Sequence, residues 1–167
     1  MLEIKFIPHK NITASQINEI VNIKSISWPY SYNSQIDWIS KNLKENDIHA
    51  LMYNENSLVA YLNLIDIEIE IDGITISGFG IGNVCAKEKG KGWGTEIITQ
   101  TNNILVQSKK IGILFCKNSL VNFYSKNKWK LIERENVSLS FENESIETFI
   151  YNYYKEIEFL KYLGKAF

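Results

Sequence analysis

The sequence is poor in several residue types that mark common functional sites. Its 167 residues include two cysteines and two histidines. Cys85 and Cys116 match neither a zinc-site spacing nor a disulfide framework, and their apolar neighbours predict two buried thiols. His9 and His49 lie far apart in the chain, so a metal would need the fold to bring them together. We therefore expect no metal site.

Neither sign of charge is in excess, and no long apolar run is present. The 18 basic and 19 acidic side chains give a formal net charge of −1, which argues against a nucleic-acid partner because such binding relies on clustered cations. No run approaches the roughly 20 apolar residues of a membrane span, and residues 1–7 alternate instead of forming a signal-peptide core. We expect a cytoplasmic protein with no membrane partner and one domain over residues 1–167.

Only two prolines interrupt the chain, and no linker divides it. The hydrophobic spacing predicts elements in the order β-α-α-β-β-β-α-β-α-β-β, and Thr13 with Gln16 predicts a capping box at the first helix. An antiparallel meander followed by a strand–helix–strand crossover predicts a mixed α+β fold: a mostly antiparallel central sheet with one parallel pair, flanked by helices. Residues 137–141 and 146–154 are expected to form a final hairpin, and residues 156–167 a helix.

Two adjacent strands show unusual patterns. Isoleucines alternate with Asp66, Glu68, Glu70 and Asp72, which places the four carboxylates on one strand face. The main interpretation is an exposed face of an antiparallel sheet, and the alternative is a funnel that attracts a cationic substrate. After the turn at Gly73, residues 74–86 form a strand that is rich in glycine, which permits a bulge or the close approach of a ligand.

A glycine-rich segment follows this strand and precedes a helix. It consists of Lys89, Gly90, Lys91, Gly92, Trp93, Gly94 and Thr95. Glycines let backbone N–H groups approach an anion, and the helix start adds partial positive charge, so the segment predicts an anion cradle. The alternative is an ordinary flexible connection. The segment lacks the Lys-Ser/Thr ending of a nucleotide P-loop, and no GxGxxG run or preceding parallel βαβ unit indicates a Rossmann site.

The basic-x-x-Gly-x-Gly pattern of residues 89–94 resembles the pyrophosphate-binding motif of the GNAT superfamily of acyl-CoA N-acyltransferases, with Lys89 where Gln or Arg is common. The resemblance implies acetyl-CoA as co-substrate, with residues 89–95 holding its pyrophosphate. It also implies that backbone groups of Val84, Cys85 and Ala86 pair with the pantetheine arm, and that a backbone N–H near Val84 stabilises the oxyanion.

A second segment, residues 122–129, is similar to the family's aromatic-Tyr-Glu-Lys-x-Gly-aromatic stretch. By this resemblance Tyr124 is the general acid that protonates the leaving thiolate, a role that its ordinary pKa of about 10 permits. Ser125 replaces the usual acidic residue, and Lys128 replaces the usual glycine of the turn. Asn118 lies near the family's frequent asparagine, one residue closer to the tyrosine.

The general base and the acceptor site are less defined. Residues 74–86 contain no Asp, Glu or His, so a base from that strand is excluded; Asp66, Glu68 and His49 remain as candidates, and an amine that arrives neutral needs none. Trp28, Tyr30 and Tyr32 lie where the family closes over the acceptor. They are expected to receive a cation or a flat ring, with core packing as the alternative.

The sequence therefore predicts an acetyl-CoA-dependent N-acetyltransferase acting on a small, cationic amine, and the resemblance makes a homodimer a further expectation. Two alternatives belong to other classes. One is a catalytically silent acyl-CoA-binding or regulatory module, and the other is a phosphate- or nucleotide-binding protein that uses the glycine loop alone.

Overall fold

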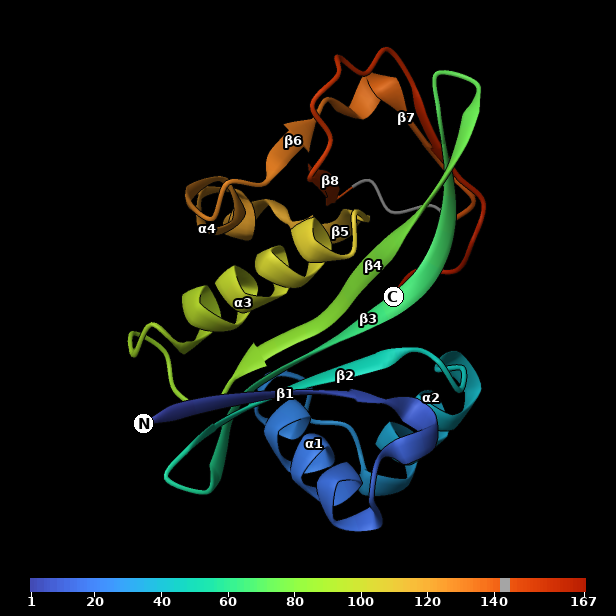
Figure 1. Ribbon diagram of the computed structural model, residues 1–167. Helices are drawn as coiled ribbons and strands as arrows, with labels where there is room; N and C mark the ends of the chain where they lie inside the picture. Colours follow the sequence, from blue (N-terminus) through green and yellow to red (C-terminus); the bar gives the residue numbers. More distant parts are fainter. Residues whose placement is uncertain (142–144) are drawn as a thin grey trace. The chain divides into compact units, whose positions relative to one another are not determined.

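The computed structural model describes residues 1–141 and 145–167 (Figure 1). The chain forms two compact units: unit 1 comprises Met1–Ile65 and Gly82–Thr101, and unit 2 comprises Asp66–Ile81 and Asn102–Phe167. Single-domain organisation over residues 1–167 stays a prediction.

The order of helices and strands follows the sequence prediction closely. The helices are α1 (Ala14–Ser27), α2 (Tyr32–Asn42), α3 (Trp93–Gln107) and α4 (Val121–Lys126), with short 3-10 turns η1 (His9–Asn11), η2 (Asn118–Leu120) and η3 (Arg134–Asn136). The strands are β1 (Leu2–Pro8), β2 (Ile48–Asn54), β3 (Ser57–Ile71), β4 (Ile74–Ala86), β5 (Ile111–Lys117), β6 (Lys130–Ile132), β7 (Val137–Leu139), β8 (Ile146–Tyr151) and β9 (Leu160–Tyr162).

The hydrogen-bonded strand order is β1-β2-β3-β4-β5-β8-β6. Strands β4 and β5 run parallel, as a helical crossover requires, whereas β1–β2, β2–β3, β5–β8 and β6–β8 are antiparallel. The mixed α+β class with a parallel crossover pair is confirmed. One further parallel pair, β7 with β9, was not predicted.

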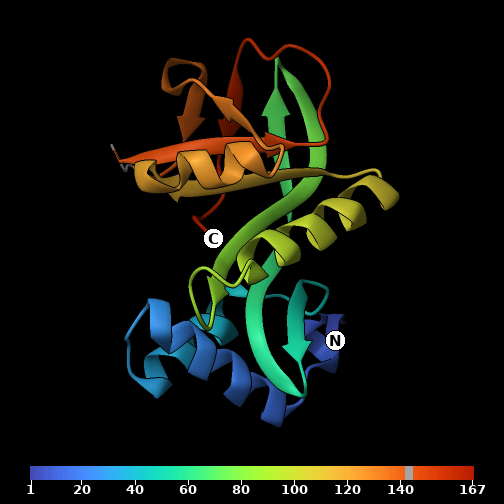
Figure 2. The same cartoon turned by 90° about the vertical axis from the view of Figure 1, so that its left-hand side faces the viewer.

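In unit 1, helices α1 and α2 lie against one face of the strands (Figures 1 and 2). Thr13 accepts a hydrogen bond from the Gln16 N–H, and the Gln16 side chain accepts one from the Thr13 N–H, so the predicted capping box is confirmed. Apolar residues at helical spacing then face the sheet. The core they form contains Ile20, Val21, Ile23, Ile39, Leu43, Leu51, Leu58, Tyr61 and Cys85.

In unit 2, β5 is the central strand, and α4 runs alongside β5 and β8 (Figure 2). Residues Ile111–Leu114 are all buried, as their continuous apolar run predicted. Gly112 admits the closest packing here: an added Cβ would lie 2.6 Å from the Trp129 ring and 2.7 Å from a Leu105 methyl.

The acidic stretch of β3 forms an exposed face over part of its length. Asp66 and Glu68 are exposed and alternate with buried Ile67 and Ile69, which agrees with the main interpretation. Asp72 does not continue that face. It lies after the strand at φ +50°, and its carboxylate accepts the N–H groups of Glu158 and Phe159 at 3.0 and 2.7 Å.

The predicted C-terminal elements are wrong in two respects. Residues 160–162 form strand β9, not part of a helix, because the Asp72 carboxylate holds the preceding backbone and Leu160 then pairs with Ile71. The predicted hairpin is replaced by β7 pairing with β9 and β8 pairing with β5 and β6. Part of its predicted turn, residues 142–144, lies outside the described residues.

Gly112→Ala is expected to lower the free energy of unfolding by about 1–3 kcal/mol, because the new methyl group overpacks the contact with Trp129 and Leu105. Urea unfolding measures the change. Thr99→Ala, on the exposed face of α3, is the control and should shift stability by less than about 0.5 kcal/mol. Equal stability of the two variants would contradict the packing argument.

Candidate active site

Strand β4 changes its backbone conformation at Asn83. The parallel ladder with β5 includes Gly78 to Ile81, and two residues later Asn83 has φ +54°. The irregularity that the sequence led us to expect from glycine therefore falls on an asparagine, a residue type that tolerates the left-handed region. The Asn83 Nδ2 donates a hydrogen bond of 2.6 Å to the Asn63 Oδ1 on β3, which fixes the side chain.

The strand continues through Val84, Cys85 and Ala86. Cys85 is buried in the unit 1 core and its neighbours are half-buried, while the Lys87 N–H donates to the Val59 carbonyl at 2.8 Å. Burial raises the pKa of the Cys85 thiol to about 12, so the thiol is protonated at neutral pH. The buried-thiol prediction is confirmed for both cysteines, and any contact of Cys85 with a ligand must use its backbone.

The loop after β4 has the geometry of an open turn into a helix. Gly90 and Gly92 both have φ +78°, and no atom lies within 4 Å of a Cβ built on either. The Gly92 carbonyl accepts the Glu96 N–H at 2.9 Å, so helix α3 starts directly after Gly92. The first-turn N–H groups of Trp93, Gly94 and Thr95 precede the first intrahelical donor and carry the helix's positive end.

The loop's lysines are on the surface. Lys89 and Lys91 are exposed, and the Lys91 ammonium lies 3.9 Å from the Glu88 carboxylate. Such an exposed ion pair is weak. The ammonium groups of Lys89 and Lys91 can therefore turn toward an anion. The arrangement can therefore hold a phosphate group through backbone N–H donors, with cations beside them.

Tyr124 lies in unit 2 on α4 and is 4% exposed. Its ring packs at 5.0 Å from the Phe123 ring and 5.8 Å from the Phe149 ring, measured between centroids. Burial, and secondarily the nearby Cys116, raise the pKa of Tyr124 above its ordinary value. The hydroxyl therefore keeps its proton at neutral pH and can act as a donor.

The turn after Tyr124 forms despite the missing glycine. Lys128 takes φ +68° in the position where the resembling motif has glycine, and the Trp129 N–H donates to the Tyr124 carbonyl at 3.1 Å. Asn102 on α3, which sequence reasoning missed, supports this turn. Its Nδ2 donates to the Asn127 carbonyl, and its Oδ1 accepts the Trp129 indole N–H.

Asn118, a predicted site residue, starts η2 and is exposed.

The predicted acceptor residues Trp28, Tyr30 and Tyr32 differ in their exposure and contacts. Trp28 ends α1 and packs against the unit 1 core, and its carbonyl accepts a hydrogen bond from the Gln35 side chain. Tyr30 and Tyr32 are 66% and 50% exposed, and the Tyr32 hydroxyl donates to Asn18. Trp28 therefore has packing contacts with the core, the two tyrosines are accessible at the α1–α2 corner, and a role of the three in acceptor binding stays a prediction.

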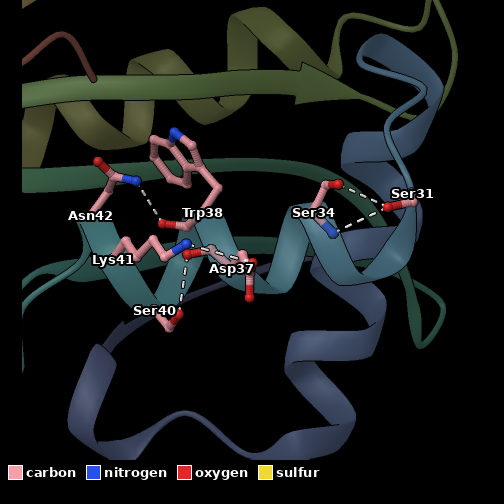
Figure 3. A network of polar contacts seen from close by, with 7 residues as sticks. All are labelled: Ser31, Ser34, Asp37, Trp38, Ser40, Lys41 and Asn42. Carbon is pink, nitrogen blue, oxygen red and sulfur yellow. Dashed lines mark hydrogen bonds and ion pairs between the residues drawn. The ribbon is translucent and has the colours of Figure 1, made fainter.

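Helix α2 holds this corner with local polar contacts (Figure 3). The Ser31 hydroxyl accepts the Ser34 N–H and caps the helix. Further along, the Lys41 ammonium lies 3.6 Å from the Asp37 carboxylate, and the Asn42 side chain donates to the Trp38 carbonyl. These contacts stabilise the helix and leave its buried face free to pack on the sheet.

A buried polar cluster in unit 1 was not anticipated. The two histidines, far apart in sequence, meet because β1 pairs with β2: the His9 Nδ1 and the His49 Nε2 are 2.9 Å apart. The His49 Nδ1 lies 2.8 Å from the Tyr61 hydroxyl. Lys24 on α1 is also buried, with its ammonium 4.3 Å from the centre of the Trp38 ring. No group of three metal-ligating side chains occurs among residues 1–141 and 145–167.

Burial changes the acid–base properties of this cluster. Desolvation, followed by the charges of His9 and Lys24, lowers the pKa of His49 to about 4. Desolvation also lowers the pKa of Lys24 to about 8. His49 is therefore a neutral imidazole at pH 7.

The sequence contains part of the signal for this cluster. His49 precedes Leu51 by two residues, so strand alternation could have placed it on the core face, but no local pattern indicates its contact with His9.

His49 should make stability depend on pH. Unfolded His49, with an ordinary pKa near 6.5, takes up a proton as the pH falls, whereas the folded side chain does so only near pH 4. Stability is thus lost as the pH falls through this window, by about 2 kcal/mol between pH 7 and pH 5. Urea unfolding of the wild type and of His49→Gln checks this. The variant should lose about that much less, and identical pH slopes would contradict the assignment.

Comparisons with known proteins identify the fold. No family model matches the chain, and no curated protein matches it. Solved structures do. Escherichia coli ElaA superposes with a TM-score of 0.64 at 19% identity, covering 90% of this chain and 99% of that one. An acyl-CoA N-acyltransferase from Pseudomonas aeruginosa gives 0.66 at 15% identity with the same coverages.

An N-acetyltransferase from Staphylococcus aureus Mu50 gives a TM-score of 0.62 at 18% identity, over 90% of this chain and 97% of that one. The chain has the fold of the GNAT acyltransferases, so the fold implied by the sequence resemblance is confirmed. None of the helices in the described parts of the chain is long and apolar enough to cross a membrane.

Proposed function

We propose that residues 1–167 form one acyltransferase domain that transfers an acetyl group from acetyl-CoA to the amine of a small acceptor. The observation that carries this proposal is the sequence of features on one stretch of backbone. The conformational break at Asn83 is followed by residues 84–86, then by Gly90 and Gly92 at positive φ, and then by the start of α3. On a GNAT fold this stretch suits a pyrophosphate and the pantetheine arm beside it.

The pyrophosphate is assigned to residues 89–95. The space around Gly90 and Gly92 is open on the Cβ side, so an anion can approach the backbone N–H groups directly. A helix start contributes about half a positive charge, and Lys89 and Lys91 add two flexible cations. This donor set favours a diphosphate through charge and N–H geometry, and its pattern does not supply the magnesium-binding hydroxyl of a nucleotide P-loop.

The reaction sets three requirements on the protein. The amine must be neutral when it attacks the thioester carbon, the tetrahedral oxyanion needs a donor, and the leaving sulfur needs a proton. We assign the oxyanion donor to a backbone N–H near Val84 and the proton to the Tyr124 hydroxyl. The raised pKa of Tyr124 supports the second assignment, because a donor that is fully protonated at pH 7 is available in every turnover.

The acceptor is proposed to be a small cationic amine that enters beside the exposed tyrosines Tyr30 and Tyr32. Their exposed rings offer cation–π faces. An amine panel assayed by release of free thiol from acetyl-CoA tests the whole proposal. Saturable turnover with one class of amine supports it. Binding of coenzyme A without turnover over the panel favours the silent acyl-CoA-binding module instead.

Coenzyme A at micromolar concentration should raise the melting temperature, and ATP should not. Gly92→Ala should weaken coenzyme A binding at least tenfold, because a Cβ at φ +78° forces the backbone away from its conformation. Gly73→Ala is a matched control, since Gly73 has φ +79° and equally open surroundings in the β3–β4 turn. Equal loss of binding in both variants would remove the loop from the ligand site.

Tyr124→Phe should lower kcat about 100-fold, as expected for loss of a general acid, and leave the KM for acetyl-CoA nearly unchanged. Tyr162→Phe removes the hydroxyl of another buried tyrosine in unit 2 and should keep wild-type kcat. If Tyr124→Phe turns over like the wild type, the acid assignment is wrong even though the enzyme is active.

A further inference from the structure

Strand β1 is an edge strand of the sheet in unit 1. Among the strands of the described residues it pairs with β2 alone, and the register runs without a shift from Leu2 to Pro8. Its seven residues make a longer edge than the three residues of β6, which ends the strand order on the other side. A long edge can pair with a further strand, and proteins usually shorten or cover such edges.

The backbone groups that face this free edge belong to every second residue of β1. One position beyond the strand, the His9 N–H donates to the Asp47 carbonyl at 2.7 Å, so these two opposed residues form a hydrogen-bonded pair. Such pairs alternate along an antiparallel ladder with pairs that exchange no bonds. Because the register is unbroken, the odd-numbered residues of β1 bond to β2. The N–H and C=O groups that point to the free edge are those of Leu2, Ile4 and Phe6.

The side chains of β1 form an apolar row and a charged row. Leu2, Ile4 and Phe6 share one face of the strand, with Leu2 43% exposed and the other two half-buried. Glu3 and Lys5 share the other face. Both are exposed, and the Lys5 ammonium lies 3.5 Å from the Glu3 carboxylate.

This pattern is complementary to itself. If two copies of β1 lie antiparallel and centred on Ile4, Leu2 of each copy stands opposite Phe6 of the other. These residues direct their backbone groups to the shared edge, so they form the hydrogen-bonded pairs of a new ladder. Glu3 of each copy then stands opposite Lys5 of the other, in the pairs whose side chains approach most closely. Apolar side chains meet on one face and opposite charges meet on the other.

The two nearest alternative registers are less favourable. Pairing centred on Glu3 would place this carboxylate opposite its own copy, and pairing centred on Lys5 would do the same with two ammonium groups. Like charges directly opposite one another are destabilising. Pairing centred on Lys5 would also place Pro8, which has no N–H, opposite Leu2. Charge therefore selects the register centred on Ile4.

We propose that β1 is the interface of a symmetric homodimer in which the unit 1 sheets of two copies join edge to edge. A second copy is the partner because the charges and apolar side chains of β1 complement themselves about a two-fold axis at Ile4. A single strand edge is a small interface, so we expect a dissociation constant in the micromolar range. The inference is independent of the proposed function, since it uses no residue of the candidate active site.

The alternative is that Glu3 and Lys5 protect the edge and keep the protein monomeric, because charged side chains on an edge strand oppose pairing. Charge reversal separates the two roles. Glu3→Lys and Lys5→Glu each leave two like charges on the strand. In the dimer these face like charges of the other copy, whereas on a protected edge they change nothing.

Sedimentation velocity at low salt, from micromolar to millimolar protein, measures the dissociation constant. Wild-type protein should show a concentration-dependent dimer, and each single reversal should weaken it about tenfold or more. An equimolar mixture of the Glu3→Lys and Lys5→Glu proteins should recover the wild-type affinity, because every charge then faces its opposite. The double variant should recover it alone. Lys41→Glu, at an exposed position of α2, changes the net charge equally and should dimerise like the wild type.

Recovery in the mixture also shows that both single variants are folded, so misfolding is not the cause of their weaker dimers. A wild-type protein that stays monomeric over the whole range overturns the interface. So does a dimer that neither reversal weakens, since it must use another surface. Weakening without recovery in the mixture or in the double variant overturns the register centred on Ile4. In all three cases the acetyltransferase assignment stands.

Discussion

The contact between Asn83 and Asn63 is the constraint on which the candidate site depends. A non-glycine residue at φ +54° is unfavourable by about 1 kcal/mol, and it persists only where neighbouring groups fix it. Asn63 does so, although its own Nδ2 has no hydrogen-bond partner, alone among the buried side-chain nitrogen and oxygen atoms of residues 1–141 and 145–167. A buried unpaired amide costs about 1–3 kcal/mol more. Two unfavourable features thus meet at one contact between β3 and β4, and backbone strain of this kind is typical of functional sites.

The loop of residues 89–95 leaves its backbone accessible to an anion because its glycines have no side chain. Gly90 and Gly92 have no Cβ atoms to cover their backbone N–H groups. Helix α3 begins at Trp93, directly after Gly92. Charge from Lys89 and Lys91 is secondary, since exposed lysines are screened by salt. In the proposed site the anion is held mainly by backbone N–H groups, and such a site is compatible with Lys89 at the position where the resembling motif has Gln or Arg.

The sequence predicted the elements that local patterns encode. Hydrophobic patterning placed the first ten α-helices and strands, through β6, and the motifs around Gly90, Gly92 and Tyr124 pointed to the GNAT fold. Contacts between distant residues escaped it: Asp72 holding the N–H groups of Glu158 and Phe159 replaced a helix by a strand. Asn102 under the Lys128 turn and His9 beside His49 escaped for the same reason, since no local pattern records which polar side chains meet.

The polar cluster beneath α1 and α2 carries an energetic argument of its own. Burial of Lys24 and His49 lowers both pKa values, because desolvation opposes the charged form of each side chain. Apolar side chains at these two positions would avoid this cost, so the folded protein would be more stable with them. The two shifts are coupled, since a charge on Lys24 opposes a charge on His49. With pKa values of about 8 and about 4, Lys24 is mostly charged and His49 neutral at pH 7. The cluster thus holds one positive charge on α1 and leaves the imidazole of His49 neutral, the state in which it can both accept and donate a proton.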